Sequence, residues 1–406
     1  MRSDPATPLP PGATGSGLPP TRPHQHRAFT HPQLSRPVTE HHTPVRRSIE
    51  IEYWVVDETG RLTDPGALVK TAPGVEREFV APLLEIKTPP CETTAELRAE
   101  LFDRLGAVLQ RAEEVGKRLV PLSTPLNHET VEELPSDRTR IQNRVIGEPF
   151  QYVRHCAGTH IHVEQQPGAA IDQLNTLIAL DPALALVNSA SHFRGRMLAV
   201  GARSELYRRL AYAGVDHQGR LWPYVEDRGE WTDRLEARYD EFFELATDAG
   251  VDPAAIESAF DPESAVWTPV QLRETFGTVE WRSPDATLPG EAIRLADTIA
   301  DLVGRIHGTD VRIGGSTGRV GEAEIVLPEF EALRDYVDTA IDEGLGDSRL
   351  RAYLDRMGFD VGAYEPIARN LVGRGPVTPA EARSLRLDYA DRLSAAVDRP
   401  PSLEAD

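Results

Sequence analysis

Three short segments that lie far apart in the chain each carry two ionisable side chains separated by a single residue. They are Glu50-Ile51-Glu52, His160-Ile161-His162 and Glu280-Trp281-Arg282. Each lies in a stretch with the composition of a β-strand, where a step of two residues returns the side chain to the same face of the sheet. If the three strands are neighbours, one sheet face carries carboxylates and imidazoles with an arginine at its edge. Burying such a face is costly unless cations neutralise it, so the pattern predicts a metal-assisted site on a β-sheet.

The chain is acidic and contains few lysines. Its 406 residues include 64 Asp and Glu but 44 Lys and Arg, which gives a formal charge of −20, and Lys70, Lys87 and Lys117 are the only lysines. This charge disfavours nucleic-acid and anionic-membrane partners. An acidic, lysine-poor surface is typical of proteins that work in concentrated salt, because salt screens the repulsion between like charges. The composition favours a halophilic protein, with a high-GC codon bias as the alternative explanation for the missing lysine.

Cysteine and hydropathy patterns indicate a soluble cytoplasmic protein. The two cysteines, Cys91 and Cys156, neither require a disulfide framework nor match the spacing of a Cys-rich zinc site. The sequence has no uninterrupted apolar run of about 18 residues, and its start lacks the apolar core of a signal peptide. We therefore expect no membrane partner. The oligomeric state stays open, a homo-oligomer included.

The chain divides into a tail, one folded domain and a short C-terminal end. Residues 1–45 are rich in Pro, His, Thr and Gly and have no apolar periodicity, which predicts a disordered tail. Its histidines could bind metal, but a flexible leader, or a start codon set too early, is the favoured interpretation. We expect residues 46–396 to form a single catalytic domain and residues 397–406 to be flexible.

The hydrophobic pattern predicts a mixture of strands and helices. Strands are expected at 48–56, 76–87, 118–122, 154–164 and 274–282. A capping box of Thr93 and Glu96 precedes a helix that ends near Val115. Further helices are expected at about 169–190, 202–212, 230–249, 289–307, 326–343, 347–357 and 378–395. Because the strands are few, alternate polar with apolar residues and are separated by long helical segments, the pattern favours an α+β domain with a mainly antiparallel sheet.

Four glutamates are candidate metal ligands. Glu50 and Glu52 share one strand face, for which a solvated sheet face is the ordinary alternative. Glu85 lies among apolar residues, where a lone carboxylate is costly. Glu78, seven residues earlier, reaches the same site only if the chain bulges or bends, as Pro82 allows.

The histidine and arginine segments each allow two interpretations. His160 and His162 on one strand face are a common metal-ligand arrangement, and a satisfied pair of core histidines is the ordinary alternative. Gly158, close by, would let a bound group approach the backbone. Glu280 and Arg282 could form an ion pair with each other, but an arginine beside metals is equally suited to holding phosphate oxygens.

The remaining arginines, and the absence of common nucleotide-binding and hydrolase motifs, limit the reactions that the chain could catalyse. Arg203, Arg369 and Arg374 supply positive charge, although surface solvation is the ordinary role of such residues. The sequence has no Gly-rich phosphate loop, no dinucleotide-binding fingerprint and no nucleophile elbow, so the common nucleotide-binding and serine-hydrolase folds lose support. Carboxylates with one or two histidines prefer Mg²⁺ or Mn²⁺ over zinc. Two such ions neutralise charge on a transferring phosphoryl group, so the residues indicate metal-dependent phosphoryl chemistry.

Several of these segments together resemble a known family. In order and rough spacing, from about residue 46 to 310, they are similar to the motifs of glutamate–cysteine ligase family 2, the carboxylate–amine ligases. The matching segments are Ser48 to Glu52, Leu83 to Cys91, Ala157 to Val163 and Gly277 to Arg282. Arg369 to Arg374, followed by Gly375, resembles the family's C-terminal motif more weakly. The resemblance implies a fold similar to glutamine synthetase, in which a mainly antiparallel sheet forms a funnel and helices pack on its outer face.

The resemblance also implies two metal sites on this sheet face. They would take Mg²⁺ or Mn²⁺, two or more ions in all. One ion would be held by Glu52, Glu78 and Glu85, and the other by Glu50, His160 and Glu280. Glu50 and Glu52, although neighbours on one strand face, would then serve different ions.

Further roles follow from the same resemblance. Arg282 would contact the phosphates of ATP and, with Glu280, act in catalysis. Arg203 and Arg374 would help to bind the nucleotide phosphates. The substrate pocket would include His162 and Arg203.

The implied reaction depends on ATP. The γ-carboxylate of L-glutamate attacks the γ-phosphate, and an amine, most simply L-cysteine, captures the resulting acyl phosphate to give an amide, ADP and phosphate. Two alternatives stay open: a metal-dependent amide hydrolase with the same ligands, and a homologue that binds a metabolite without catalysis. A requirement for ATP separates the ligase from the hydrolase.

Overall fold

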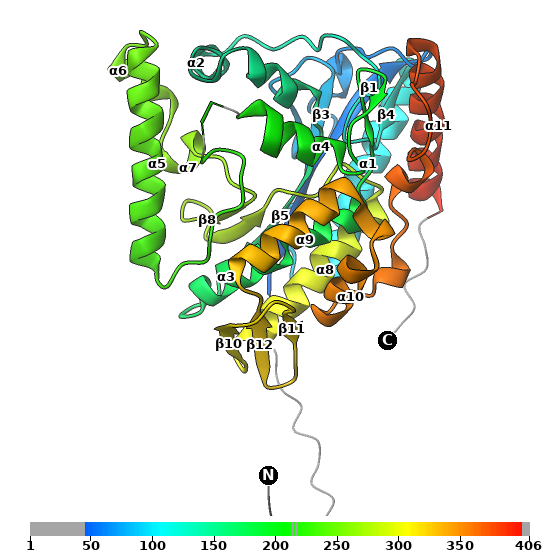
Figure 1. The fold of residues 1–406 in the computed structure, drawn as a ribbon. Helices are drawn as coiled ribbons and strands as arrows, with labels where there is room; N and C mark the ends of the chain where they lie inside the picture. Colours follow the sequence, from blue (N-terminus) through cyan, green and yellow to red (C-terminus); the bar gives the residue numbers. More distant parts are fainter. Residues whose placement is uncertain (1–44, 213, 216, 400–406) are drawn as a thin grey trace, which may run out of the picture. The chain divides into compact units, whose positions relative to one another are not determined.

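A single antiparallel sheet organises the computed structural model, which describes residues 45–212, 214–215 and 217–399. Its strands are β1 (Arg47–Asp57), β2 (Val75–Arg77), β3 (Leu83–Lys87), β4 (Lys117–Val120), β5 (Thr159–Glu164), β8 (Val270–Arg273) and β9 (Thr278–Trp281). Their order is β2-β3-β1-β5-β9-β8, with β4 also paired to β1. Figure 1 labels β1, β3, β4, β5 and β8 of this sheet. Every strand pair in this sheet is antiparallel.

Three helices pack on one face of this sheet. They are α1 (Thr94–Glu114), α3 (Ala170–Leu180) and α8 (Pro289–Ile306). Along β1, Ile49, Ile51 and Tyr53 are fully buried and join the apolar residues of these helices in one hydrophobic core. Glu50 and Glu52 alternate with them and therefore point to the opposite face. The expected α+β fold, with a mainly antiparallel sheet and helices packed on one side, is confirmed.

Further elements surround this core. The helices are α2 (Asp137–Ile146), α4 (Ala202–Glu205), α5 (Arg228–Asp248), α6 (Pro253–Ala259), α7 (Pro262–Ala265), α9 (Phe330–Asp342), α10 (Ser348–Arg356) and α11 (Pro379–Asp398). The 3₁₀ segments η2 (Glu148–His155) and η3 (Asp181–Val187) and the π-helix η4 (Leu206–Ala211) join some of them. Two small sheets consist of β6 (His192–Phe193) with β7 (Arg196–Met197), and β10 (Asp310–Ile313) with β12 (Glu324–Leu327) and β11 (Arg319–Val320).

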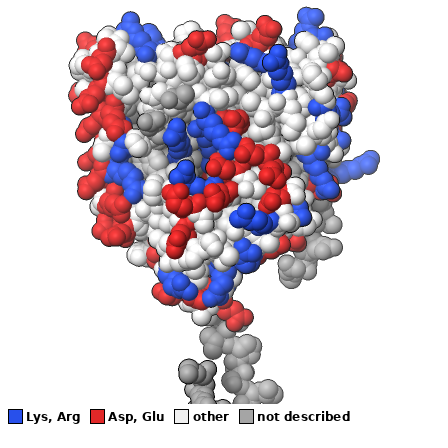
Figure 2. Space-filling view, in the orientation of Figure 1, with Lys and Arg blue, Asp and Glu red and all other residues white. Residues whose placement is uncertain are grey.

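Acidic side chains line the exposed side of α5. Figure 2 shows them as a red column at the left edge of the molecule, where Figure 1 places this helix. The exposed acidic residues of α5 are Asp233, Glu236, Asp240, Glu241, Glu244 and Asp248. Like charges at this density repel one another unless salt screens them.

Several expected elements differ in extent from those observed. The strand expected at 76–87 is the pair β2 and β3, because the chain reverses around Pro82. The strand expected at 274–282 contains only β9; the preceding residues form a turn back to β8, with Gly277 at φ +64°. The strand expected at 154–164 begins only at Thr159, after η2. The range expected for a helix at 326–343 includes the last two residues of β12, and α9 itself begins at Phe330. Hydrophobic alternation alone does not reveal such reversals.

Other elements were not expected. No element was expected between the strands at 118–122 and 154–164, but Ser136 and Thr139 form a capping box there that starts α2. Helices α6 and α7 and the small sheet of β10 to β12 also lacked a strong periodic pattern. Short elements of this kind are fixed by their packing and caps more than by their own sequence.

The described residues belong to one compact unit. The tail predicted for 1–45 lies outside the described residues apart from Val45, and the predicted flexible end, 397–406, is described only to Arg399. Among the described residues one apolar segment, Ala170–Val187, is long enough to cross a membrane by length and composition, but 89% of it is buried within the fold. A buried core helix of a soluble protein has the same property.

A buried ion pair ties the end of β9 to two helical segments. Arg208 on η4 donates to both carboxylate oxygens of Asp181 at 2.7 and 3.1 Å. The indole of Trp281 donates to Asp181 at 2.9 Å, and the hydroxyl of Ser283 also bonds it. Because residues 281 and 283 alternate with 280 and 282, this network holds the strand from the side opposite to Glu280.

Replacing Asp181 with Asn should destabilise the fold by about 3–5 kcal/mol, because it leaves the charge of Arg208 buried without a counterion. Guanidinium denaturation of the Asp181→Asn variant measures this. Asp338→Asn is a matched control, since Asp338 pairs at the surface with the neighbouring Arg209 and should cost less than about 1 kcal/mol. Equal losses in the two variants would contradict the role given to Asp181.

Candidate functional site

The antiparallel register brings most of the predicted residues together on the free face of the sheet. The cross-strand partners are Glu52 with Glu85, Glu50 with His160, and His162 with Glu280. Directly opposed residues point to the same face of a sheet. The three two-residue steps of the sequence therefore form one continuous surface.

A cavity of about 420 Å³ lies over this surface. Its walls come from the sheet and from helical segments that include α2, η2, α4, η4 and α5. Of the predicted site residues, Arg374 is the one that does not line it. The others are Glu50, Glu52, Glu78, Glu85, His160, His162, Arg203, Glu280 and Arg282.

Three glutamates form the first group in this cavity. One oxygen each from Glu52, Glu78 and Glu85 lies within 4.8 Å of the others. Glu78 reaches the group because the chain turns back between β2 and β3. The backbone N–H of Gly158 donates to Glu52 at 2.6 Å, and that of Phe79 donates to Glu78 at 3.2 Å. The three carboxylates thus converge as ligands do around one cation.

The protein balances only part of the charge of this first group. Burial raises the pKa of Glu52 to about 7, although the charge of Arg203 acts in the opposite direction. Burial and the charge of Glu52 raise the pKa of Glu78 to about 7. Burial and the charge of Glu78 raise the pKa of Glu85 well above its usual value. Ionising all three carboxylates is therefore unfavourable unless a cation is added.

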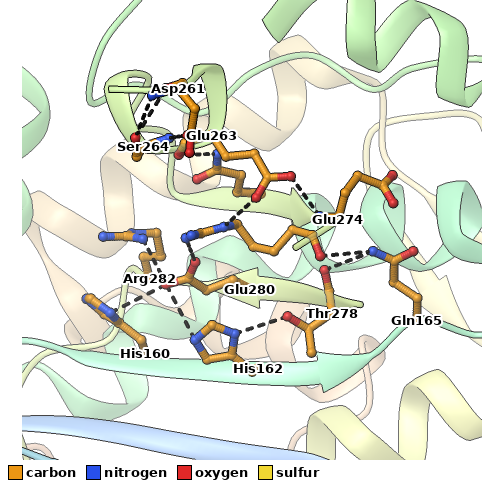
Figure 3. A network of polar contacts seen from close by, with 12 residues as sticks. His160, His162, Gln165, Asp261, Glu263, Ser264, Glu274, Thr278, Glu280 and Arg282 are labelled. Atoms are coloured by element: carbon orange, nitrogen blue, oxygen red, sulfur yellow. Dashed lines mark hydrogen bonds and ion pairs between the residues drawn. The ribbon is translucent and has the colours of Figure 1, made fainter. Parts of the chain in front are cut away.

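Two histidines and two glutamates form the second group. Nδ1 of His160 lies 3.5 Å from Glu50 and 3.4 Å from Glu280, and Nε2 of His162 lies 3.7 Å from both carboxylates. Figure 3 shows both imidazoles pointing toward Glu280. Donor atoms of Glu50, His162 and Glu280 lie within 4.8 Å of one another. His162, which the family resemblance placed in the substrate pocket, is therefore a member of this group in the structure.

One ring nitrogen of His162 is hydrogen-bonded, and within the described part of the chain the other is not. Its Nδ1 lies 3.1 Å from the hydroxyl of Thr278 (Figure 3). Its buried Nε2 has no hydrogen-bond partner among the described residues. A buried nitrogen in this state is a candidate ligand atom, because leaving it unpaired is costly.

Glu280 forms the ion pair with Arg282 that the sequence allowed. It also faces both histidines. Arg282 donates to one oxygen at 2.9 Å and Arg273 to the other at 2.6 Å. Burial would raise the pKa of Glu280, but Arg282 and the imidazoles outweigh it and lower the pKa to about 2. Burial and the charge of Arg282 lower the pKa of His160 to about 4, so this imidazole is neutral at pH 7. Neutral imidazole is the form that binds metal.

Lys87 is a member of the site that the sequence interpretation missed. Its ammonium lies 2.7 Å from Glu85, 3.6 Å from Glu76 and 3.7 Å from Glu50. Burial would lower the pKa of Lys87, but the charges of Glu85 and Glu50 raise it overall, so the ammonium is charged. The signal was present in the sequence, because Lys87 follows Glu85 by two residues and is one of three lysines in the chain.

Arg203 packs against the backbone of Gly158 at the wall of the cavity. Its guanidinium donates to the carbonyls of Ser283 at 3.0 Å and Arg282 at 3.2 Å. A Cβ on Gly158 would lie 2.2 Å from Nη2 of Arg203. The glycine was expected to leave room for a bound group, but the chain's own arginine fills that room.

An aromatic wall lies beside the two arginines. The ring of Trp267 stacks on Tyr207 with centroids 3.9 Å apart and on Tyr212 at 6.4 Å. Arg282 lies 5.6 Å from the centroid of Trp267, and Arg203 lies at the same distance from Tyr207. Sequence reasoning missed these rings because they lie in a π-helix and a loop, where no strand or helix period marks the side that faces the site.

Arg374 lies away from this cavity. Its exposed side chain donates to the carbonyl of Asn370 at 3.2 Å. Arg369 lines a different cavity. A role of Arg374 in binding phosphates therefore stays a prediction without support from this arrangement.

Comparison with solved structures identifies the class of fold. A bifunctional glutathione synthetase from Pasteurella multocida is 15% identical with a TM-score of 0.52, covering 88% of this chain and 53% of that one. Glutamate–cysteine ligase from Francisella tularensis, solved in complex with AMP, is 12% identical with a TM-score of 0.51, covering 88% of this chain and 90% of that one. At this identity the likeness concerns the fold alone.

Comparison of sequences identifies the family. Residues 40–352 match the model of glutamate–cysteine ligase family 2, so the chain belongs to that family, as its motifs indicated. Two curated relatives carry the provisional name glutamate–cysteine ligase 2. One, from Chloroflexus aggregans, is 26% identical over 64% of each chain. The other, from Paracoccus denitrificans, is 29% identical over 59% of this chain and 60% of the relative. The matched regions thus span less than two thirds of these relatives.

A buried carboxylate behind Arg203 should make stability depend on pH. Burial raises the pKa of Asp285 to about 6, although Arg203 acts in the opposite direction. This value is above the unfolded pKa of about 3.9, so the folded state binds more protons and loses stability as pH rises from about 4 to 6. Asn cannot ionise. The stability of Asp285→Asn relative to wild type should therefore rise by about 1–3 kcal/mol between pH 4 and pH 7.

Guanidinium denaturation at several pH values and constant ionic strength measures this difference. The same substitution at the exposed Asp335 is the control and should show no such rise. A difference between Asp285→Asn and wild type that stays constant with pH would contradict the raised pKa of Asp285.

Proposed function

We propose that this protein is an ATP-dependent carboxylate–amine ligase that joins the γ-carboxylate of L-glutamate to an amine, most simply L-cysteine. One observation carries the proposal: in a member of this family, two groups of metal-type ligands and two arginines line the same cavity. The choice of glutamate and cysteine rests on the family to which the chain belongs.

The two groups fit Mg²⁺ or Mn²⁺. Carboxylate oxygens with a few imidazoles suit these ions. The raised pKa values of Glu52 and Glu78 and the unpartnered Nε2 of His162 are the features expected of ligands. In our proposal Glu52, Glu78 and Glu85 hold one ion, and Glu50 and Glu280 hold the other with the histidines. Such ions neutralise the negative charge of phosphoryl oxygens during transfer.

Arg282 and Arg203 are the proposed phosphate ligands. Each keeps a buried Nε without a hydrogen-bond partner among the described residues. Glu280 orients Arg282 through the 2.9 Å ion pair. Fixed guanidinium groups of this kind stabilise the charge of a transferring phosphoryl group without having to reorganise.

The proposed reaction has two steps. A γ-carboxylate oxygen of glutamate forms a bond to the γ-phosphorus of ATP, and the bond from that phosphorus to ADP breaks. The amine nitrogen then attacks the carbonyl carbon of the acyl phosphate, loses a proton, and displaces phosphate to leave an amide.

We also infer the setting of this reaction. The acidic surface over α5 and the formal charge of −20 support a cytoplasm with high salt. Joining glutamate to cysteine would serve the synthesis of glutathione-type thiols. Assays of the protein accordingly belong in concentrated KCl.

Phosphate release should require ATP, glutamate, a divalent cation and an amine together. The measurement is an amine panel in concentrated KCl, scored by phosphate release and by the mass of the product. Cysteine is expected to give the largest rate and a product whose mass is that of glutamate plus cysteine minus one water. Amide cleavage without ATP would favour the hydrolase. No turnover with any amine would contradict the proposed ligase activity.

Replacing Glu280 with Gln should lower turnover by about 100-fold or more, because it removes the charge that faces Arg282 and both histidines. Phosphate release under the same conditions measures this, and circular dichroism checks that the fold is kept. Glu331→Gln is the matched control, since Glu331 is exposed on α9 and does not line the cavity over the sheet. Unchanged turnover in Glu280→Gln would remove this residue from the site.

A further inference from the structure

A third group of potential ligands lies between the two proposed metal sites. One donor atom each from Glu50, Glu85 and His160 lies within 4.8 Å of the others. Glu85 belongs to the first site and Glu50 to the second, so this third group joins them. By ligand type alone it could hold a divalent ion of its own.

A cation of the protein already contacts this third group. The ammonium of Lys87 lies 2.7 Å from Glu85 and 3.7 Å from Glu50, two of its three members. Glu76, on the neighbouring strand, lies 3.6 Å from the same nitrogen. The contact with Glu85 is within hydrogen-bond distance, and the two longer ones are ion pairs, so three carboxylates surround one ammonium.

The backbone holds Lys87 in this position. Its residue lies directly opposite Glu50 in the register of β1 and β3. On the other side its N–H donates to the carbonyl of Gly74 at 2.8 Å. The side chain is about one third exposed, and its charged end is turned to Glu85 and Glu50. Pairing on both sides thus fixes the backbone of Lys87 and directs its side chain to the face that carries Glu50.

We propose that Lys87 takes the place of a divalent ion in this third group, so that the cavity binds two such ions and not three. The proposal rests on the metal sites of the proposed function. An ammonium and a divalent ion that shared Glu50 and Glu85 would repel each other at short range in a partly buried cavity. Its ammonium contacts Oε2 of Glu85 and Oε1 of Glu50, which leaves the other oxygen of each carboxylate for a flanking ion.

The test is the number of Mn²⁺ ions bound per chain, measured from the electron paramagnetic resonance signal of free Mn²⁺ during a titration. Concentrated KCl screens the acidic surface and limits non-specific binding. Wild type should bind two ions. Lys87→Met, which has a neutral side chain of similar length, should bind three, whereas Lys87→Arg should still bind two.

Lys70→Met is the matched control, since it removes one of the other two lysines outside the cavity and should leave the count at two. Three ions in wild type, or two in a folded Lys87→Met variant, would overturn the proposal and leave the proposed function standing. A wild-type count below two would overturn the metal sites themselves. The wild-type count tests the proposal even if Lys87→Met does not fold.

Discussion

The pairing of β1 with β3 on one side and β5 on the other sets the position of almost every charged group in the cavity. Ile49 and Ile51 are fully buried against the helices, so the alternation of the strand turns Glu50 and Glu52 to the opposite face. A slip of one residue in this register would put the carboxylates into the hydrophobic core and the isoleucines into the cavity. The energy of the apolar core therefore holds the acidic site together, although the two share no side chains.

The two halves of the site differ in how their charge is balanced. Glu280 has two arginines and two imidazoles around it, which keep it ionised. Glu52 and Glu78 have no comparable partners among the described residues, and their pKa values rise to about 7. The half at β3 thus depends more on an added cation than the half at β9. Lys87 lies between the halves and supplies only part of the missing charge.

The residues of the site that lie along a regular strand could be predicted from the sequence, and most of the others could not. The two-residue steps on β1, β5 and β9 were sufficient to predict one shared face, because alternation is a property of the local chain. Glu78 could be predicted only as conditional on a bend, which the structure has between β2 and β3. The aromatic wall, including Tyr207 and Trp267, could not be predicted, because tertiary packing brings a π-helix and a loop to the cavity. The opposite case is Arg374, whose side chain bonds the carbonyl of Asn370 and does not line the cavity, because a short sequence match does not fix where a loop lies.

Alternation on β9 also links the cavity to the buried ion pair behind it. Glu280 and Arg282 face the cavity, while Trp281 and Ser283 bond Asp181 on the other side. The partner of Asp181, Arg208, lies on η4 one residue from Tyr207, which lines the cavity. A shift of this network would therefore move the guanidinium of Arg282 and the aromatic wall together. In the proposed function Arg282 binds phosphate, and an arginine in that role must be held in place before the reaction. The satisfied buried pair on the far side of the strand provides that rigidity.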